Sequence, residues 1–314
     1  MRETCLPCRR VGGRMRAGGG PAAVACVLLM AATTAFASGW KPADPSYRIQ
    51  LPRDHAAHPA QKIEGWYYTG NLAAADGRRF GYQLTFFRVG VDPSPANPSR
   101  WAVRDLHLAH FAISDLGRGR HLYADRLNRD GVGWAGARAD TYRVWNEDWE
   151  ATLDASGRHR LRAADARIAL DLVLDEGKPV VLHGEAGYSR KGPSPGNASH
   201  YYSLTRMPTR GTLTVDAERV EVTGASWMDH EFGTSFLEPG QVGWDWFSIQ
   251  LDDGSEVMLF QIRRSDGSAD PFASGTLVDA DGRARPLGAG AFQLVAGDTW
   301  TSPRSGGRYP VAWR

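Results

Sequence analysis

Alternating apolar and polar residues dominate the chain beyond residue 45, and this pattern predicts β-strands. Residues 80–89 (FGYQLTFFRV), 101–114 and 166–175 (ARIALDLVLD) repeat with a period of two, which sends successive side chains to opposite faces of a strand. In 166–175 the aliphatic residues share one face and the acids Asp171 and Asp175 share the other, as in a half-buried strand. Helical periodicity is hard to find in the same region, so we expect an all-β protein.

Turn residues separate these strands at short intervals. Ala75-Asp76-Gly77 follows the aromatic strand 65–72, and Asp252-Asp253-Gly254 follows the alternating strand 244–251, both of which are hairpin signals. Many short strands with such turns are typical of barrels and sandwiches. We expect two consecutive antiparallel barrels, at 45–207 and 208–314, with the boundary at Pro208-Thr209-Arg210-Gly211. The second stretch has barely enough residues for eight strands of roughly ten residues, so we expect an incomplete barrel at its C-terminus.

The first 37 residues have the pattern of an export signal. Five arginines precede an apolar run at 22–35, and Ala35-Phe36-Ala37 offers a small-x-small cleavage site. The run is shorter than the roughly 18 apolar residues of a membrane span. A cleaved signal peptide and a periplasmic or secreted protein are therefore predicted. A membrane anchor and, through Arg9-Arg10, a twin-arginine route are the alternatives.

Removing this leader changes the charge and the redox chemistry. The leader holds five of the 37 basic residues and one of the 35 acidic residues, which leaves 32 against 34 and a net charge of −2. The chain without its leader therefore lacks the excess of positive charge that is typical of nucleic-acid-binding proteins. All three cysteines (Cys5, Cys8 and Cys26) lie in the leader, so the mature protein has no disulfide and no thiol nucleophile.

Candidate chemistry concentrates in two polar-aromatic segments, 199–203 (SHYYS) and 226–233 (SWMDHEFG). Alternation places Trp227 and Asp229 on one face and His230 on the other, while His200 and Tyr202 share a face of their own strand. Aspartate is disfavoured in strands, so Asp229 is either a functional acid or a buried acid satisfied by backbone donors. Aromatic walls would raise the pKa of such an acid and keep it protonated near neutral pH.

The remaining polar and aromatic residues allow plainer interpretations as well. His200 fits a hydrogen-bonded core residue, and Glu64 fits either a cavity acid or a loop cap. His230 and Glu231 could join His55 and His58 around a metal, but their spacing matches no known zinc motif, so no metal and no cofactor are predicted. No Gly-x-Ser-x-Gly elbow occurs, which excludes the usual serine hydrolase. Aromatic stripes form either core or the lining of an apolar ligand cavity: Trp66, Tyr68, Phe86, Trp244 and Trp246.

These segments resemble the carotenoid 1,2-hydratase family and its AttH-like relatives, often labelled predicted secreted hydrolases. The resemblance runs over most of the mature chain, through Asp54-His55-x-x-His58-Pro59, Glu64-x-Trp66-Tyr67-x-Thr69-Gly70, Ser199-His200-Tyr201-Tyr202-Ser203 and 227–233 (WMDHEFG). It implies two lipocalin-like barrels. Gly65 departs from it, because the family usually has a second tryptophan there, and the chain stops where the family continues with further strands.

The resemblance also implies a site. A His-x-aromatic pair and an aromatic-x-Asp pair take part in catalysis in the hydratases, and these correspond to His200 with Tyr202 and Trp227 with Asp229. We expect Asp229 to donate a proton and His200 to lie beside it in one cavity. The substrate would contact Glu64, Trp66, Tyr68, His230, Trp244 and Trp246.

The expected function is acid–base catalysis by a hydratase, or a related lyase or hydrolase, on an isoprenoid or lipid substrate. The alternative is a non-catalytic carrier of a hydrophobic ligand, or an accessory of an ABC-type export system. The expected partner in either case is a hydrophobic small molecule or lipid, with association at a membrane surface and without nucleic acid.

Overall fold

The computed structural model describes residues 39–235 and 237–314, and the predicted signal peptide at 1–37 lies outside the described residues. The described chain is built of strands, as the alternation predicts, with two short 3-10 turns. No helix in these residues has the length and hydropathy of a membrane span. In chain order the elements are η1 (Arg53–His55), β1 (Ile63–Ala74), β2 (Arg79–Gly90), β3 (Asp105–Asp115), β4 (Arg120–Arg129), β5 (Ala135–Ala137), β6 (Arg143–Asn146), β7 (Trp149–Leu153), β8 (His159–Ala164), β9 (Ile168–Leu174), β10 (Val181–Leu182), β11 (Tyr188–Arg190), β12 (Ala198–Val215), β13 (Glu218–Gly233), β14 (Gln241–Gln250), β15 (Glu256–Arg264), β16 (Ser274–Val278), β17 (Ala284–Gly288), η2 (Ala289–Ala291), β18 (Thr299–Thr301) and β19 (Arg308–Pro310).

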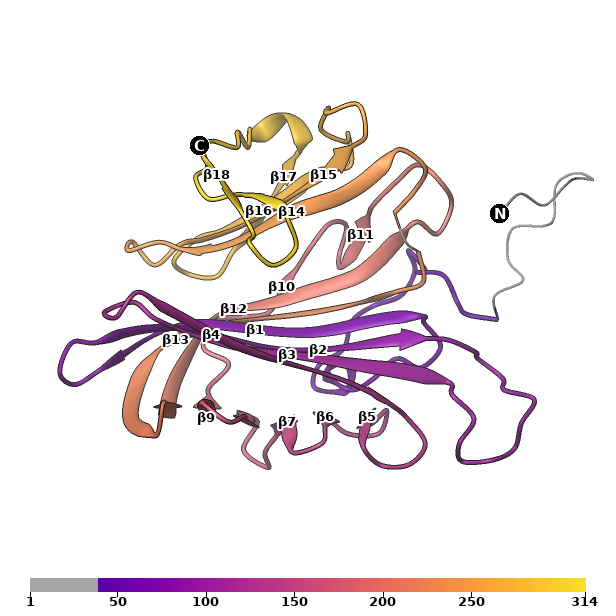
Figure 1. Ribbon diagram of the computed structural model, residues 1–314. Coiled ribbons are helices and arrows are strands. Elements are labelled where there is room, and N and C mark those ends of the chain that lie inside the picture. The colour runs from indigo at the N-terminus through magenta and orange to yellow at the C-terminus, as the bar shows by residue number, and fades with distance from the viewer. Residues whose placement is uncertain (1–38, 236) are drawn as a thin grey trace, which may run out of the picture. The chain divides into compact units, whose positions relative to one another are not determined.

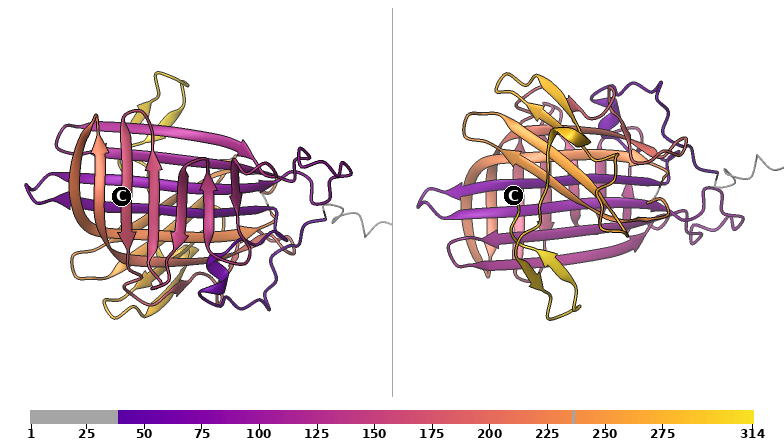
Figure 2. Two further views of the ribbon diagram at one scale, coloured as in Figure 1. Left: turned by 90° about the horizontal axis from the view of Figure 1, so that it is seen from below. Right: turned by 90° about the horizontal axis from the view of Figure 1, so that it is seen from above.

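Thirteen of these strands form one antiparallel sheet that curls into a nearly closed barrel (Figure 1). The order is β4-β3-β2-β1-β13-β12-β9-β8-β7-β6-β5, with β10 and β11 also paired to β12. One wall holds β1 to β4, and the opposite wall holds the short strands β5 to β9, which Figure 2 shows from below. The even-numbered residues of β1, including Trp66 and Tyr68, point into the barrel and pack in its core.

Two long strands, β12 and β13, carry the sheet from one wall of the barrel to the other. Each bends sharply, as the curled ribbons in Figure 1 show, and each has a glycine where a neighbouring backbone comes close. A Cβ at Gly211 would lie 2.1 Å from the carbonyl oxygen of Asp171, and a Cβ at Gly224 would lie 2.1 Å from that of Asn71. The bend therefore requires residues without a side chain at these positions.

We expect Gly224→Ala to lower the free energy of unfolding by about 3 kcal/mol, the upper end of overpacking effects. The added methyl meets backbone atoms of β1, which have no rotamer to move into. Urea unfolding followed by tryptophan fluorescence measures the loss. Gly290→Ala is the matched control, because nothing lies within 4 Å of a Cβ there. Equal unfolding midpoints for the two variants would contradict this reason for the glycine.

The second sheet, β14-β15-β16-β17, packs on the outer side of β12 and β13. Seen from above in Figure 2, its strands cross those of the barrel wall beneath. A buried carboxylate anchors it, because Glu256 of β15 binds Lys178 at 2.9 Å and Arg206 of β12 at 2.5 Å. The hairpin of β18 and β19 follows, and Arg304 in its turn binds the Tyr123 hydroxyl of β4.

The predicted boundary at 207/208 falls inside β12, which continues to Val215. Residues 209–215 pair with β9, and β13 pairs with β1 from Val222 to Gly233, so the division between the sheets lies after Gly233. Within the described residues the second unit is a four-stranded sheet with open edges where we expected a barrel. Strands β4 and β5 were not predicted, since β4 alternates weakly and β5 has three residues.

Candidate active site

The candidate residues on β12 and β13 divide between the two faces of the barrel wall. Tyr202 lies opposite His230, and Ser203 lies opposite Asp229. Opposed residues in an antiparallel pair share a face, so Tyr202 and His230 point into the barrel. Ser203 and Asp229 point outward, toward the second sheet. Two polar clusters therefore lie back to back across one layer of backbone.

The inner cluster is a hydrogen-bonded chain of buried side chains. Tyr202 Oη lies 2.7 Å from His55 Nδ1 and 3.1 Å from His230 Nδ1. His230 Nε2 lies 3.0 Å from Glu64 Oε1, and His58 Nδ1 lies 2.8 Å from the same oxygen. Burial disfavours the Glu64 carboxylate, but the hydrogen bonds from His230 and His58 outweigh it and hold its pKa below the usual range. Arg88 adds an ion pair at 3.2 Å, so Glu64 stays ionised.

The outer cluster centres on Asp229. Its Oδ1 accepts hydrogen bonds from the Ser203 hydroxyl and from Trp227 Nε1, the latter at 2.8 Å. Burial raises the pKa of Asp229 to about 7, against the lowering effect of hydrogen bonds from Ser203, Trp227 and Tyr201. Because Oδ1 is occupied by two donors, the acid form carries its proton on Oδ2. Asp229 is thus about half protonated at neutral pH, with donors in place to stabilise its anion.

Sequence reasoning missed the imidazole that serves this acid. His183 Nε2 lies 2.6 Å from the Ser203 hydroxyl, and His183 Nδ1 lies 2.8 Å from Thr276 Oγ1 on β16. Burial, with a smaller effect of Lys191, lowers the pKa of His183 to about 3. A neutral His183 donates from Nε2 to Ser203 and accepts at Nδ1 from Thr276, which turns the Ser203 proton toward Asp229. The two-residue strand β10 places His183, and so short a strand leaves no alternation to detect.

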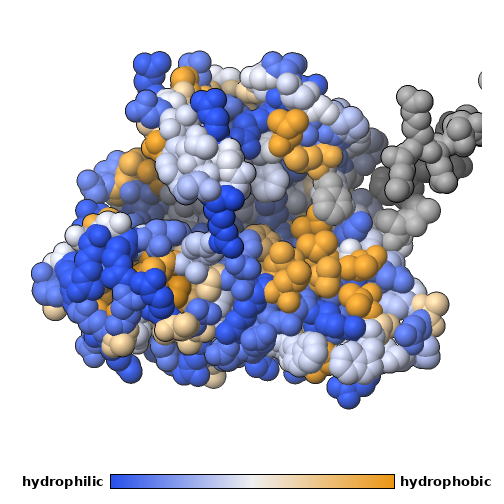
Figure 3. Space-filling model, in the orientation of Figure 1, coloured by the Kyte–Doolittle hydropathy of each residue, from blue (hydrophilic) through white to orange (hydrophobic). Residues whose placement is uncertain are grey.

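A cavity of about 130 Å³ lies beside this cluster, between the barrel wall and β14. Trp227 lines it together with residues of β1 and β14: Thr69, Gly70, Asn71, Ser248 and Gln250. Trp246 extends the cleft, since its Nε1 donates to Tyr201 Oη at 3.1 Å and its ring meets Tyr67 edge-on. Figure 3 shows the hollow between the two sheets, with hydrophobic residues gathered on the barrel side of its mouth.

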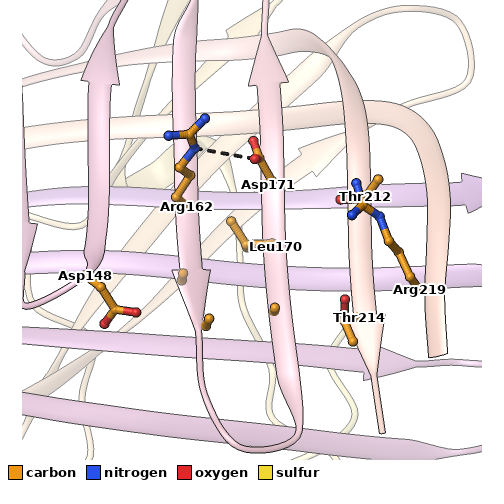
Figure 4. Close-up of a pocket in the computed structure, with 10 residues that line it drawn as sticks. Asp148, Arg162, Leu170, Asp171, Thr212, Thr214 and Arg219 are labelled. Carbon is orange, nitrogen blue, oxygen red and sulfur yellow. Dashed lines mark ion pairs between the residues drawn. The ribbon is translucent and has the colours of Figure 1, made fainter. Parts of the chain in front are cut away.

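A larger depression of about 250 Å³ lies on the opposite wall, outside β8, β9 and β12 (Figure 4). Its rim is polar, and Arg162 pairs with Asp171 across it at 3.4 Å. None of the predicted site residues lines this depression. The predicted site residues therefore lie elsewhere, on the two faces of the wall formed by β12 and β13 and on the strands that pack against it.

The structure joins Trp227 and Asp229 on the outer face and packs Trp246 against the same side of the wall, and it places Glu64, Trp66, Tyr68, Tyr202 and His230 inside the barrel. Trp244 shares the barrel-facing side of β14 with Trp246 and is 61% exposed at the mouth of the cleft. The expectation that His200 lies beside Asp229 is wrong. His200 is on the inner face, where it accepts from the Asp44 amide at 3.3 Å and packs against Tyr47.

Fold and site together define an all-β protein in which a buried acid of raised pKa lies between a nearly closed barrel and a second sheet. Residues 42–314 match the AttH-like family, and the chain belongs to that family. The crystal structure of a protein assigned as AttH from Nitrosomonas europaea is similar with a TM-score of 0.80 at 36% identity, covering 87% of this chain and 83% of that one. Kievitone hydratase from Nectria haematococca shares the fold with a TM-score of 0.65 at 13% identity, over 88% of this chain and 81% of the other. No curated protein sequence matches the chain.

Proposed function

We propose that the protein is an acid–base catalyst that adds water to, or removes it from, an apolar isoprenoid or lipid substrate in the cleft between the two sheets. One observation carries the proposal: a buried carboxyl group with a pKa near 7 accepts a hydrogen bond from the indole of Trp227, a residue that lines a cavity. An acid of this pKa is matched to proton transfer at neutral pH. The hydratase fold of this chain is consistent with that reaction.

The reaction begins when Asp229 transfers its Oδ2 proton to one carbon of the alkene, which leaves a carbocation on the other. The Trp227 ring stabilises this cation by about 2 kcal/mol when water is excluded. Ser203 and Trp227 stabilise the new carboxylate through the hydrogen bonds they already make to Oδ1. Water then attacks the cation and returns a proton to Asp229, which restores the acid. His183 is a positioning residue that holds the Ser203 hydroxyl.

An apolar strip on the outer face of β1 to β4 is an argument for an elongated apolar substrate. Strand pairing aligns Phe87, Leu108 and Leu127 in one row. A second row holds Ile63, Val89 and Leu106. An extended hydrocarbon chain would lie along this strip with its reactive end at Trp227, which gains roughly 25 cal/mol per Å² of apolar surface removed from water.

We also propose a periplasmic or secreted location and an apolar ligand taken up at a membrane surface, because the leader has the pattern of an export signal. Fractionation of cells that produce the full chain tests the location. Recovery of the uncleaved chain in the cytosol would contradict it.

Incubation of the protein with polyisoprenoid alkenes, lycopene among them, in D2O tests the reaction. The expected product gains one hydroxyl group and one carbon-bound deuterium for each alkene consumed, as mass spectrometry measures. An unmodified lipid that co-purifies with the protein, with no product from any alkene, would instead support the carrier or export-accessory function.

A further inference from the structure

Two buried histidines inside the barrel have ring nitrogens without a partner. Among the described residues, Nε2 of His55 and Nε2 of His159 are buried and make no hydrogen bond. Their rings lie edge to face with centroids 5.0 Å apart. An unsatisfied buried polar atom costs about 1–3 kcal/mol, and two such atoms in adjacent rings call for a common explanation.

The hydrogen bonds around Tyr202 determine which nitrogen of His55 carries the proton. His230 donates from Nε2 to the Glu64 carboxylate, so its Nδ1 is an acceptor facing Tyr202. The Asp54 carbonyl is a second acceptor for the same hydroxyl, at 3.2 Å. When the single Tyr202 proton goes to one of these acceptors, His55 Nδ1 donates to the Tyr202 oxygen. In this tautomer His55 Nε2 has a free lone pair, the form that binds metals.

His159 is held in the same manner from the other side. Its Nδ1 lies 2.8 Å from Tyr68 Oη, which in turn lies 2.6 Å from Tyr142 Oη. Hydrogen bonds of this kind fix the ring orientation of histidine ligands in metal sites. Burial lowers the pKa of His159, so its ring is neutral and able to act as a ligand.

A carboxylate completes the group. His159 pairs with Leu174 at the end of β9, and two residues further on Glu176 places its Oε1 3.7 Å from His55 Nε2. One donor atom from each of His55, His159 and Glu176 lies within 4.8 Å of the others. Tetrahedral zinc with bonds near 2.1 Å separates its donors by about 3.4 Å, which is close to the 3.7 Å between Glu176 Oε1 and His55 Nε2. Glu176 is half-exposed, which leaves an entry path for an ion.

We propose that His55, His159 and Glu176 bind a divalent transition metal such as zinc at this end of the barrel. Two imidazoles and one carboxylate form the ligand set of catalytic zinc sites, with a further position open to water. The other His and Glu group in the barrel, His58, Glu64 and His230, does not fit an ion. Its donors already bind one another, and Arg88 neutralises Glu64.

Titration calorimetry with zinc chloride tests the site in the purified chain, carried on a tag without histidine. We expect one zinc per chain and binding at least about tenfold weaker in Glu176→Gln and His159→Gln. Cobalt in place of zinc should give the visible absorption of a tetrahedral site, and this band should disappear in both variants. Glu185→Gln, an exposed carboxylate elsewhere, is the matched control and should leave binding unchanged.

Absence of binding, or equal affinity in Glu176→Gln and the parent protein, would overturn the metal site. The Glu176 variant keeps this test decisive if His159→Gln fails to fold, because Glu176 is half-exposed. The site lies inside the barrel and Asp229 lies on the outer face, so this outcome leaves the proposed acid–base function untouched.

Discussion

Asp229→Asn is expected to lose turnover on any accepted substrate by about 10²- to 10⁴-fold, the usual contribution of a positioned general acid. The amide has the shape of the carboxyl group and still accepts hydrogen bonds from Ser203 and Trp227, so the fold should survive. What it lacks is a proton to give to an alkene. Initial rates of product formation at neutral pH measure the loss.

The pH dependence of the same rate identifies the acid. Only the protonated form of Asp229 starts the reaction, so the rate should fall as the pH rises through about 7. The Ser203 hydrogen bond lowers the pKa of Asp229. Ser203→Ala should therefore raise this pKa and move the alkaline limb of the profile to higher pH.

Asp245→Asn is the matched control for the activity measurement. It makes the same chemical change on the other face of β14, where Asp245 pairs with Arg263, and it should leave the rate unchanged. A folded Asp229→Asn protein with the parent rate would refute the assigned role, because another group would then have to supply the proton.

A steep loss of stability between pH 6.5 and about 4 is the second large effect that we expect. Burial lowers the pKa of His107, His200 and His230 to about 4 and that of His183 to about 3. His159 shifts in the same direction. The unfolded chain binds protons at these residues below pH 6.5, whereas the folded chain resists them. The stabilisation that comes from keeping these histidines neutral is therefore fully present above pH 6.5. It is lost as the pH falls toward their pKa values in the folded state.

The size of this effect follows from the pKa differences. A depression of about 2.5 units corresponds to about 3 kcal/mol for each histidine. Asp229 and His58 act in the opposite sense, because their raised pKa values favour the folded state as the pH falls, and Asp229 alone offsets roughly one histidine. The net loss of about 10 kcal/mol is comparable to the whole stability of a typical domain, so we expect acid unfolding near pH 5.

Urea unfolding midpoints at several pH values between 7.5 and 4.5 measure this loss. His107→Gln removes one titrating group inside the barrel and should make the dependence on pH less steep by about one proton. A midpoint that stays constant from pH 6.5 to 4.5 would show that the buried histidines accept protons freely in the folded state.

Alternation predicted the strands that build the barrel wall. For each strand by itself, it also predicted which residues share a face. It placed Asp229 with Trp227 and separated Asp229 from His230, as the structure confirms. Burial of Asp229 was also expected from the sequence, because it lies within an aromatic-rich segment and shares a strand face with Trp227. These are properties of one strand and need no knowledge of its partner.

The sequence could not predict which residues of β12 share a face with Asp229 of β13, because a β-bulge shifts the pairing of the two strands. From the turn at 216–217 the strands pair up to Met207 with Ser226, but beyond the bulge Leu204 pairs with Met228. Two residues of β12 oppose one of β13 there, and such a shift exchanges the faces of all the residues that follow. Without it, His200 would share a face with Asp229. With the bulge, Ser203 points outward beside Asp229. His183, which follows the two-residue strand β10, contacts the Ser203 hydroxyl there.

The ionisation state of Asp229 in the folded protein is the direct test of the account. Carbon-13 NMR of the aspartate side-chain carboxyl groups, with the Asp229 signal assigned from its absence in Asp229→Asn, follows this group through a pH titration. The account predicts a midpoint close to 7. A midpoint at or below the ordinary value near 4 would contradict it, because the carboxyl group would then be ionised at neutral pH and have no proton to donate.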